Sequence, residues 1–322
     1  MRVASIKLMY LRLRVIPFVT ACFALLGCSL QSDSTSGLQA QTQDTRKSRF
    51  GVLLMAHGGS SEWNAAVTSV ASDIDGFMPI EIAFGMADAG SIERAAQRLE
   101  DRGVTHAGVV RLFVSGDSWL ERTLMIFGLK EGAPSKEEWA AEKAKHTEMS
   151  MPMGFWNIQS PIRFSLSQEG LANSEEMDIV IRDRIASLSK NPHKETVMVI
   201  AHGTGDDEEN FELIRLISER TKLAKSELGM DQIKVFSLRE DWMGKRAESE
   251  FEIRNFLQEA QKSANEVIVI PFRVQGFGPY QKVLADLTYN SDGLGLLPHP
   301  AVGDWIKNQA SILEKLLLGA AI

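Results

Sequence analysis

From residue 50 onward, short apolar runs alternate with amphipathic stretches. The runs are rich in Val, Ile, Leu and Ala, as buried strands are, whereas the stretches between them repeat apolar positions about every three or four residues, as helices do. In the first half of the chain this pattern predicts strands at 51–56, 80–84 and 108–114 and helices at 62–74 and 92–102.

The second half repeats the same order of elements. Its pattern predicts strands at 197–201, 233–237 and 267–272 and helices at 208–225, 245–262 and 301–318. Strands that alternate with helices are typical of α/β proteins, in which the strands are parallel and helices cover both faces of the sheet. We therefore expect each half to form one Rossmann-like lobe.

The two halves are also similar in amino-acid sequence. Residues 52–59 read VLLMAHGG and residues 197–204 read VMVIAHGT. A looser match relates 109–116 to 269–276, which end in Val-Ser-Gly and Val-Gln-Gly. The sequence thus predicts an internal duplication, with an N-terminal lobe at 49–192 and a C-terminal lobe at 193–322.

An irregular stretch at about 128–173 interrupts the first half. It contains three prolines and a candidate polar helix at 135–146. We expect an insertion that covers a cleft or a partner surface, or else a hydrophobic face of the lobe. Its His146, Met149, Met151 and Met153 are soft ligands that would suit copper(I), or they form an apolar lid.

The first residues have the pattern of an export signal. Four basic residues and no acidic ones precede an apolar run at 15–26, too short to span a bilayer comfortably. The run closes on Leu-Leu-Gly-Cys28, which resembles the bacterial lipobox. We expect a lipoprotein signal peptide at 1–27, lipidation at Cys28 and a flexible polar tether at 28–48. A buried N-terminal helix is the alternative; on the first interpretation the protein is exported and lipid-anchored in the bacterial envelope, on the periplasmic face.

Composition removes several classes of function. The 322 residues carry a net charge of −7, so a nucleic acid partner is not expected. Both cysteines lie near the N-terminus, and the body of the chain therefore lacks thiolate zinc clusters and cysteine nucleophiles. Metal chemistry would have to use His, Asp, Glu or Met.

Two histidines stand where ligands bind in parallel sheets. His57 and His202 each follow a predicted strand, and ligands of open parallel sheets bind beyond the carboxyl ends of the strands. The glycines that follow would let the backbone turn and leave the imidazole exposed. Each histidine is a candidate metal ligand or general base, the alternative being a turn or capping residue.

Motifs of hydrolases and of nucleotide-binding proteins are missing from the sequence. His57-Gly58-Gly59-Ser60 resembles the oxyanion loop of an α/β-hydrolase, but no G-x-S-x-G nucleophile elbow occurs. Phosphate-binding loops of the G-x-x-x-x-G-K-[ST] type and G-x-G-x-x-G motifs after a strand are also absent from the sequence. The sequence implies no organic cofactor.

Together these motifs resemble the sirohydrochlorin cobaltochelatase family, class II chelatases related to the ferrochelatases. The resemblance rests on the Ala-His-Gly strand end, the strand at 81–84, the Val-Ser-Gly end of the third strand and the Leu-Pro-His-Pro at 297–300. It implies two α/β lobes around a cleft and insertion of Co²⁺, Fe²⁺ or Ni²⁺, as a substrate, into a tetrapyrrole. By this resemblance His57 and Glu81 are the catalytic residues, His57, Glu81 and His202 hold the metal, and Gly58, Gly59 and Ser60 contact the macrocycle.

The sequence departs from the family pattern at one point. The family usually has a second histidine after the third strand, where this chain has Trp119 and, in the second half, Pro279. Asp117, His202 or His299 could complete the site, activity could be reduced, or the protein could bind a tetrapyrrole without metalating it. Trp119 and Phe277 offer flat faces for a macrocycle, with packing as the alternative, and His299 could reach the cleft.

The second half also has Lys234 where the first has Glu81, so the first lobe is the expected active one. The resulting expectation is a metal chelatase, a lyase, that acts on a sirohydrochlorin-type tetrapyrrole. The alternative is a non-catalytic tetrapyrrole- or metal-binding lipoprotein of the envelope. The oligomeric state stays open.

Overall fold

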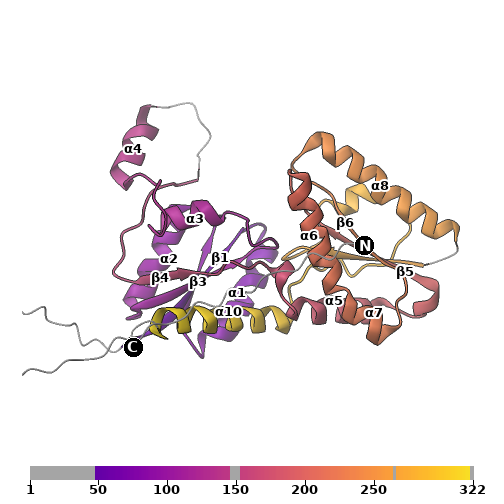
Figure 1. Cartoon of the computed structure of the whole chain (residues 1–322), viewed down its shortest axis with the longest axis horizontal. Helices are drawn as coiled ribbons and strands as arrows, with labels where there is room; N and C mark the ends of the chain where they lie inside the picture. The colour runs from indigo at the N-terminus through magenta and orange to yellow at the C-terminus, as the bar shows by residue number, and fades with distance from the viewer. Residues whose placement is uncertain (1–47, 146–152, 264–265, 320–322) are drawn as a thin grey trace, which may run out of the picture. The chain divides into compact units, whose positions relative to one another are not determined.

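A computed structural model describes residues 48–145, 153–263 and 266–319. In this part of the chain the strands form two parallel sheets (Figure 1). The first has the order β2-β1-β3-β4, and the second has the order β6-β5-β7. The strands are β1 (Phe50–Ala56), β2 (Ile80–Phe84), β3 (His106–Leu112), β4 (Arg163–Leu166), β5 (Glu195–Ala201), β6 (Ile233–Ser237) and β7 (Glu266–Phe272).

The duplication predicted from the sequence is visible in the topology. In each sheet the first strand of that half lies between the second and the third. The register matches as well, because Ala56 pairs with Phe84 and Leu112, while Ala201 pairs with Ser237 and Phe272. The prediction of an α/β fold with two similar parallel-sheet lobes is confirmed.

The predicted helices are present, one of them divided, and the structure adds helices at Leu120–Ile126, Glu176–Leu188 and Tyr280–Val283 that the sequence did not predict. The helix expected at 208–225 is divided at Thr221 into two helices, α6 and α7. None of the described helices is long and apolar enough to cross a membrane. The helices are α1 (Ser61–Asp75), α2 (Ala89–Asp101), α3 (Leu120–Ile126), α4 (Lys136–Lys145), α5 (Glu176–Leu188), α6 (Asp207–Arg220), α7 (Lys222–Leu228), α8 (Met243–Lys262), α9 (Tyr280–Val283) and α10 (Pro300–Gly319).

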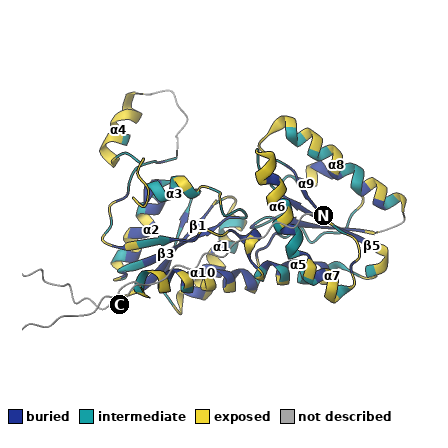
Figure 2. Cartoon of the chain, in the orientation of Figure 1, coloured by how far each residue is buried: buried dark blue, intermediate teal, exposed yellow. Residues whose placement is uncertain are grey.

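Buried strands place alternate side chains in two different cores. In β1, Val52 and Leu54 belong to one hydrophobic cluster, and Leu53 and Met55 belong to another on the opposite face. All seven residues of β1 and of β5 are buried, as expected for central parallel strands with helices on both faces. Figure 2 shows the strands in dark blue under partly exposed helices. The first cluster extends through both halves, so the two sheets share one continuous core.

Each half contributes a helix to the other. α10 comes at the end of the second half but packs on β3, β4 and α1 of the first sheet, and Figure 1 shows it running along that sheet. Conversely, α5 precedes the second half and packs on α6, α7 and β7. The strands of the two sheets thus separate at the boundary expected near residue 193, whereas these two helices each pack on the sheet of the other half.

Part of the expected insertion belongs to the fold. β4 pairs with β3 and completes the first sheet, and Ile158 and Ile162 are buried against the α2 side of that sheet. Covering a hydrophobic face is thus the role of the residues from 153 onward. By contrast, α4 has no buried residue, and Figure 2 shows it largely exposed.

Several sequence predictions fall on residues outside the described ranges. These are the signal peptide, the tether and Cys28, together with His146, Met149 and Met151. They stay predictions.

Candidate functional site

The two histidine loops leave their strands in the same way. His57 follows β1 and His202 follows β5, and the next glycines have φ of +79° at Gly58 and +84° at Gly203. A side chain is rarely tolerated in this left-handed region, so glycine is needed for the turn. A Cβ at Gly203 would lie 2.9 Å from the backbone nitrogen of Arg239. The close approach of these two loops fixes where the histidine side chain lies.

The imidazole rings have the same orientation in both lobes. Nδ1 lies 2.7 Å from the carbonyl oxygen of Gly58 in His57, and 2.8 Å from that of Gly203 in His202. Because a carbonyl oxygen only accepts hydrogen bonds, this contact is a hydrogen bond when Nδ1 carries the proton. The neutral ring then keeps its lone pair on Nε2. Each histidine can therefore accept a proton or contact a metal ion through Nε2.

Of the two loop histidines, His202 is the one whose Nε2 has carboxylates beside it among the described residues. Nε2 lies 3.2 Å from Oδ2 of Asp241 and 3.9 Å from Oε2 of Glu240. Both acids follow β6, where a left-handed residue, Arg239 with φ of 55°, turns the chain. A proton or a cation between the imidazole and Asp241 would satisfy both groups. This cluster of His202, Glu240 and Asp241 is the second-lobe site.

Glu240 is held in place by Arg273. The carboxylate of Glu240 pairs with Nη1 of Arg273, and the Glu240 side chain is only 12% exposed. The guanidinium lies over the ring of Tyr280, with its carbon 5.6 Å from the ring centroid. Tyr280 is fully buried, and burial raises the pKa of its hydroxyl group, which therefore stays neutral. Asp241 is 73% exposed and is the carboxylate that a ligand can reach.

The positions that correspond to Glu240 and Asp241 in the first lobe do not offer a free carboxylate to His57. Because Ala56 and Ala201 stand at equivalent register positions, Ala87 corresponds to Glu240 and Asp88 to Asp241. Asp88 caps α2 by accepting a hydrogen bond of 2.7 Å from the Ser91 nitrogen, and its other oxygen accepts one from Gly154. It is therefore occupied by the fold.

The surroundings of His57 are aromatic instead. Its ring lies edge-on to Trp63, at 6.4 Å between centroids, and Trp63 lies edge-on to Phe84. His202 has a similar neighbour in Trp242, at 5.9 Å. The two tryptophans come from different places, the first turn of α1 and the start of α8.

Glu81 does not join His57. It pairs with Leu53, four residues before His57, so about 13 Å of strand separates the two positions. Its carboxylate accepts hydrogen bonds of 2.6 Å from Nε of Arg98 and 3.0 Å from Nη1 of Arg102. Glu81 thus ties β2 to α2. The structure thus places Glu81 away from His57 and in ion pairs with α2, and its expected catalytic and metal-binding roles stay predictions.

The expected metal set is not assembled. Among the described residues no group of three or more His, Cys, Asp or Glu side chains is arranged to hold a metal ion. His57, Glu81 and His202 therefore do not form a common metal site, because Glu81 lies at the opposite end of its strand. A substrate metal that is handed to a macrocycle needs only a transient contact with the protein.

The glycine-serine loop after His57 is engaged by α1. The Gly59 nitrogen donates to the side-chain oxygen of Asn64 at 3.0 Å, and Ser60 caps α1 by accepting from Trp63. The loop after His202 is arranged likewise, since Thr204 donates to Asn210 and Asp206 caps α6. The expected contacts of Gly58, Gly59 and Ser60 with a macrocycle stay predictions.

Trp119 is exposed enough to contact a ligand. It precedes α3 with φ of 59° and is 37% exposed. A left-handed backbone is strained for such a large residue and is a feature often found at functional sites. The loop before it is fastened by Arg111, which is 1% exposed and donates to the carbonyls of Gly116 and Ser118.

Phe277 and His299 serve the fold. Phe277 stacks on Tyr289 at 5.8 Å and meets Tyr280 edge-on, so one of its faces is already covered. In His299, Nδ1 accepts from the Ala301 nitrogen and Nε2 lies 3.1 Å from Asp183. Both ring nitrogens are used at the start of α10, and the interpretation of His299 as a substrate-binding residue is not supported by its contacts.

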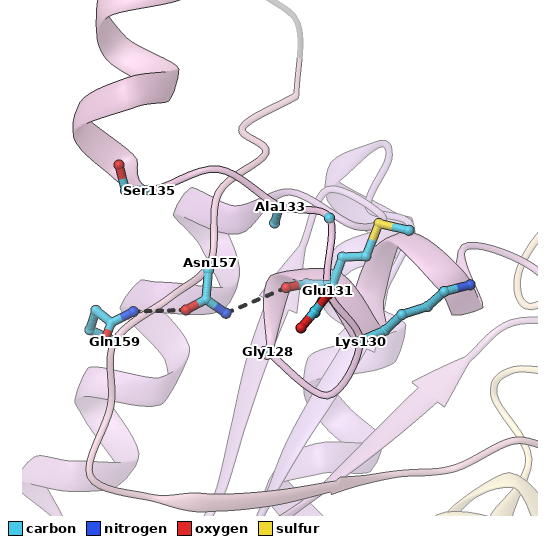
Figure 3. A pocket seen from close by; sticks show the side chains of 9 residues that line it. Gly128, Lys130, Glu131, Ala133, Ser135, Asn157 and Gln159 are labelled. Carbon is cyan, nitrogen blue, oxygen red and sulfur yellow. Dashed lines mark hydrogen bonds between the residues drawn. The ribbon is translucent and has the colours of Figure 1, made fainter.

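A cavity of about 420 Å³ lies in the 128–159 region, away from the histidine loops (Figure 3). Asn157 accepts a hydrogen bond of 2.7 Å from Gln159 and donates to the carbonyl of Met125, as Figure 3 shows. The lining amides therefore bind one another and the backbone. This cavity does not extend the histidine sites.

Comparisons with known proteins agree with the fold. No family model matches the chain, and no curated protein matches it. Among solved structures, SirB from Bacillus subtilis with Fe3+ aligns with a TM-score of 0.55 and 15% identity over 81% of this chain and 96% of that chain. The sirohydrochlorin chelatase SirB from Bacillus subtilis subspecies spizizenii in complex with cobalt aligns with a TM-score of 0.52 and 15% identity, over 82% and 96%. The resemblance inferred from the sequence is thereby confirmed at the level of the fold.

Sequence reasoning missed Glu240, Asp241 and Arg273. The signal was present, because all three follow predicted strands of the second half, at the same edge as His202. Comparison with the first half favoured Glu81 because it lies on a strand and is acidic. The strand register shows that an acid must follow its strand, rather than lie within it, to come close to the histidine.

Proposed function

We propose that the protein is a chelatase-like enzyme that inserts a divalent metal ion into a sirohydrochlorin-type or related tetrapyrrole. The observation that carries the proposal is the His202–Asp241 pair at the end of β5, in a chain with the fold of two SirB structures. Co²⁺, Fe²⁺ and Ni²⁺ are the candidate metals. They are substrates of the reaction, and the macrocycle supplies most of their ligands.

The chemistry requires a base and a weak metal contact. Insertion places M²⁺ on the four macrocycle nitrogens and releases two protons from pyrrole N–H groups. Nε2 of His202 is the acceptor for one proton, because Nδ1 is held by Gly203. Asp241 accepts the other or stabilises the imidazolium, at 3.2 Å from Nε2. Arg273 pairs with Glu240 and fixes it beside them, while the exposed Asp241 is the carboxylate that can attract the incoming cation.

The second lobe is therefore the proposed catalytic lobe, and His57 is proposed to contact the macrocycle or its metal rather than to remove protons. Trp63 and the exposed Trp119 provide aromatic surface in the first lobe. The signal-like N-terminus supports placement in the bacterial envelope, with a lipid anchor on Cys28.

A second function rests on the substitution of Trp119 for the histidine that the resembled family usually has. It is a non-catalytic lipoprotein of the envelope that binds a tetrapyrrole or a metal ion. In that case the histidines bind and release their ligand without proton transfer.

One titration separates the two functions. Sirohydrochlorin is mixed with Co²⁺ or Fe²⁺, and the absorbance of the macrocycle is followed with protein at a small fraction of the substrate. An enzyme converts all of the substrate faster than a metal-only blank. A binding protein changes the spectrum only up to one equivalent, which would contradict the chelatase proposal.

A further inference from the structure

Arg239 connects the two parts of the second-lobe site. Its φ of 55° is left-handed, a conformation that is unfavourable for a residue with a side chain. The equivalent residue of the first half, Met86, has φ of 62°. The duplication thus conserved the turn in both halves but placed a cation only in the second.

The guanidinium binds the loop after His202 at three points. Nε donates to the carbonyl of Thr204 at 2.8 Å, and Nη2 donates to that of Gly205 at 2.7 Å. Nη1 pairs with Asp207 at 2.5 Å, and the Arg239 side chain is only 12% exposed. Three donors of one planar group therefore hold the loop.

The backbone on either side of Arg239 reaches the same loop. The nitrogen of the next residue, Glu240, donates to the carbonyl of His202 at 3.2 Å. The carbonyl of Arg239 accepts from the nitrogen of Trp242, and a Cβ on Gly205 would lie 2.1 Å from Nε1 of that tryptophan. The residues that carry the carboxylates and the residues that carry the imidazole are thus packed against each other around one side chain.

Lys245 provides a second cation at the same place. Its Nζ lies 2.7 Å from the Gly205 carbonyl and 2.7 Å from Asp207. It is 40% exposed and binds as a point charge, so it supports the loop without fixing its orientation.

We propose that Arg239 is a positioning residue that holds the 202–207 loop so that Nε2 of His202 faces Asp241. This inference deepens the proposed function and rests on it for its catalytic consequence only. The arrangement of the ring is a property of the loop, and it is measurable without any substrate.

The first test is a spectroscopic one on the full chain. Arg239→Met introduces methionine, the residue at the equivalent position of the first half, where the backbone is also left-handed. Arg239→Lys keeps the positive charge. Arg254→Met is the matched control, because Arg254 also binds backbone carbonyls, at Val283 and Ala285, away from His202. Imidazole ¹⁵N shifts report which ring nitrogen carries a proton, with His202→Asn used for assignment.

The wild type and Arg254→Met are expected to show one fixed protonation pattern of the His202 ring, with distinct shifts for Nδ1 and Nε2. Arg239→Met is expected to show the averaged shifts of a ring that exchanges between both tautomers, and Arg239→Lys an intermediate state. Wild-type shifts in a folded Arg239→Met protein would overturn the inference. If Arg239→Met does not fold, wild-type shifts in Arg239→Lys would overturn it.

The second test is metal insertion by the same variants. Arg239→Met is expected to lower kcat about 10- to 100-fold with little change in KM for the macrocycle, while Arg254→Met stays near wild type. Equal rates in both variants would contradict the positioning role. If even the wild type has no turnover, the proposed function fails, whereas the ¹⁵N shifts still decide whether Arg239 orients His202.

Discussion

Glu81 accepts a hydrogen bond of 2.6 Å from Nε of Arg98, and a second arginine, Arg102, binds its other oxygen. The Glu81 side chain is 18% exposed. A carboxylate that is already neutralised twice is a poor base and a poor metal ligand. The acid that the sequence favoured as catalytic therefore connects β2 to α2.

Replacement of Glu81 by Gln should lower stability without affecting chemistry. Two charge-assisted hydrogen bonds are weakened, and we expect a loss of about 1–2 kcal/mol in the free energy of unfolding. Denaturant unfolding measures this loss, and the insertion rate of the folded variant should stay within about twofold of the wild type. Loss of insertion activity at unchanged stability would restore Glu81 to the catalytic site.

Asp178 should give the protein an unusual dependence of stability on pH. Burial raises its pKa from 3.8 to about 6, although Arg220 lies 3.1 Å away. Between these two values the folded state binds more protons than the unfolded state, so stability falls as pH rises through this range. The difference amounts to at most about 3 kcal/mol. Unfolding free energies at pH values across the range should show this slope in the wild type and not in Asp178→Asn; the same slope in both proteins would disprove the assignment.

Replacement of the buried Arg111 should lower the stability of the protein strongly. It is 1% exposed, burial lowers its pKa to about 10, and its guanidinium donates to carbonyls of Ser167, Gly116 and Ser118. Arg111→Met leaves these carbonyls without their donors, and we expect a loss of at least about 3 kcal/mol. Arg215→Met is the control, because Arg215 is half exposed and pairs with one neighbour on α6, at a cost within about 0.5 kcal/mol. Similar midpoints of urea unfolding for the two variants would contradict the role of Arg111.

Gly170 should not tolerate a side chain. A Cβ there would lie 2.5 Å from the nitrogen of Gly116 and 2.6 Å from the carbonyl oxygen of Val114. Because these are backbone atoms that cannot rotate away, Gly170→Ala is expected to cost more than about 3 kcal/mol. Gly244→Ala, in α8 with nothing near its Cβ, is expected to leave stability unchanged or to raise it by about 0.5–1 kcal/mol. Thermal unfolding of the two variants checks both, and a Gly170→Ala protein as stable as Gly244→Ala would refute the packing argument.

The sequence predicted the layout of the fold because apolar runs and amphipathic periods determine which segments are strands and helices. Strands β1, β2, β5 and β6 lie within two residues of their expected bounds at each end. It did not predict that α5 and α10 exchange sheets, because amphipathic helices do not specify which apolar face they cover. β4 was missed for a similar reason: its four residues include the polar Arg163 and Ser165 and lack a continuous apolar run.

The site was predicted in part. Both His-Gly loops were recognised from the repeated letters, and the structure gives their rings the same orientation. The acid beside His202 was not predicted, because residue type and resemblance favoured Glu81, whereas strand register determines distance. The pairing of His202 with Asp241 depends on the left-handed turn at Arg239, a backbone feature with no signature in a pattern of apolar and polar residues.

The most direct test of the account compares His202→Ala with His57→Ala in the sirohydrochlorin assay with Co²⁺, after both variants are shown to fold like the wild type. The account predicts that His202→Ala lowers kcat at least about 100-fold, because the base beside Asp241 is lost, while His57→Ala changes kcat less than about 10-fold. A rate that is lost in His57→Ala and retained in His202→Ala would contradict the second-lobe site.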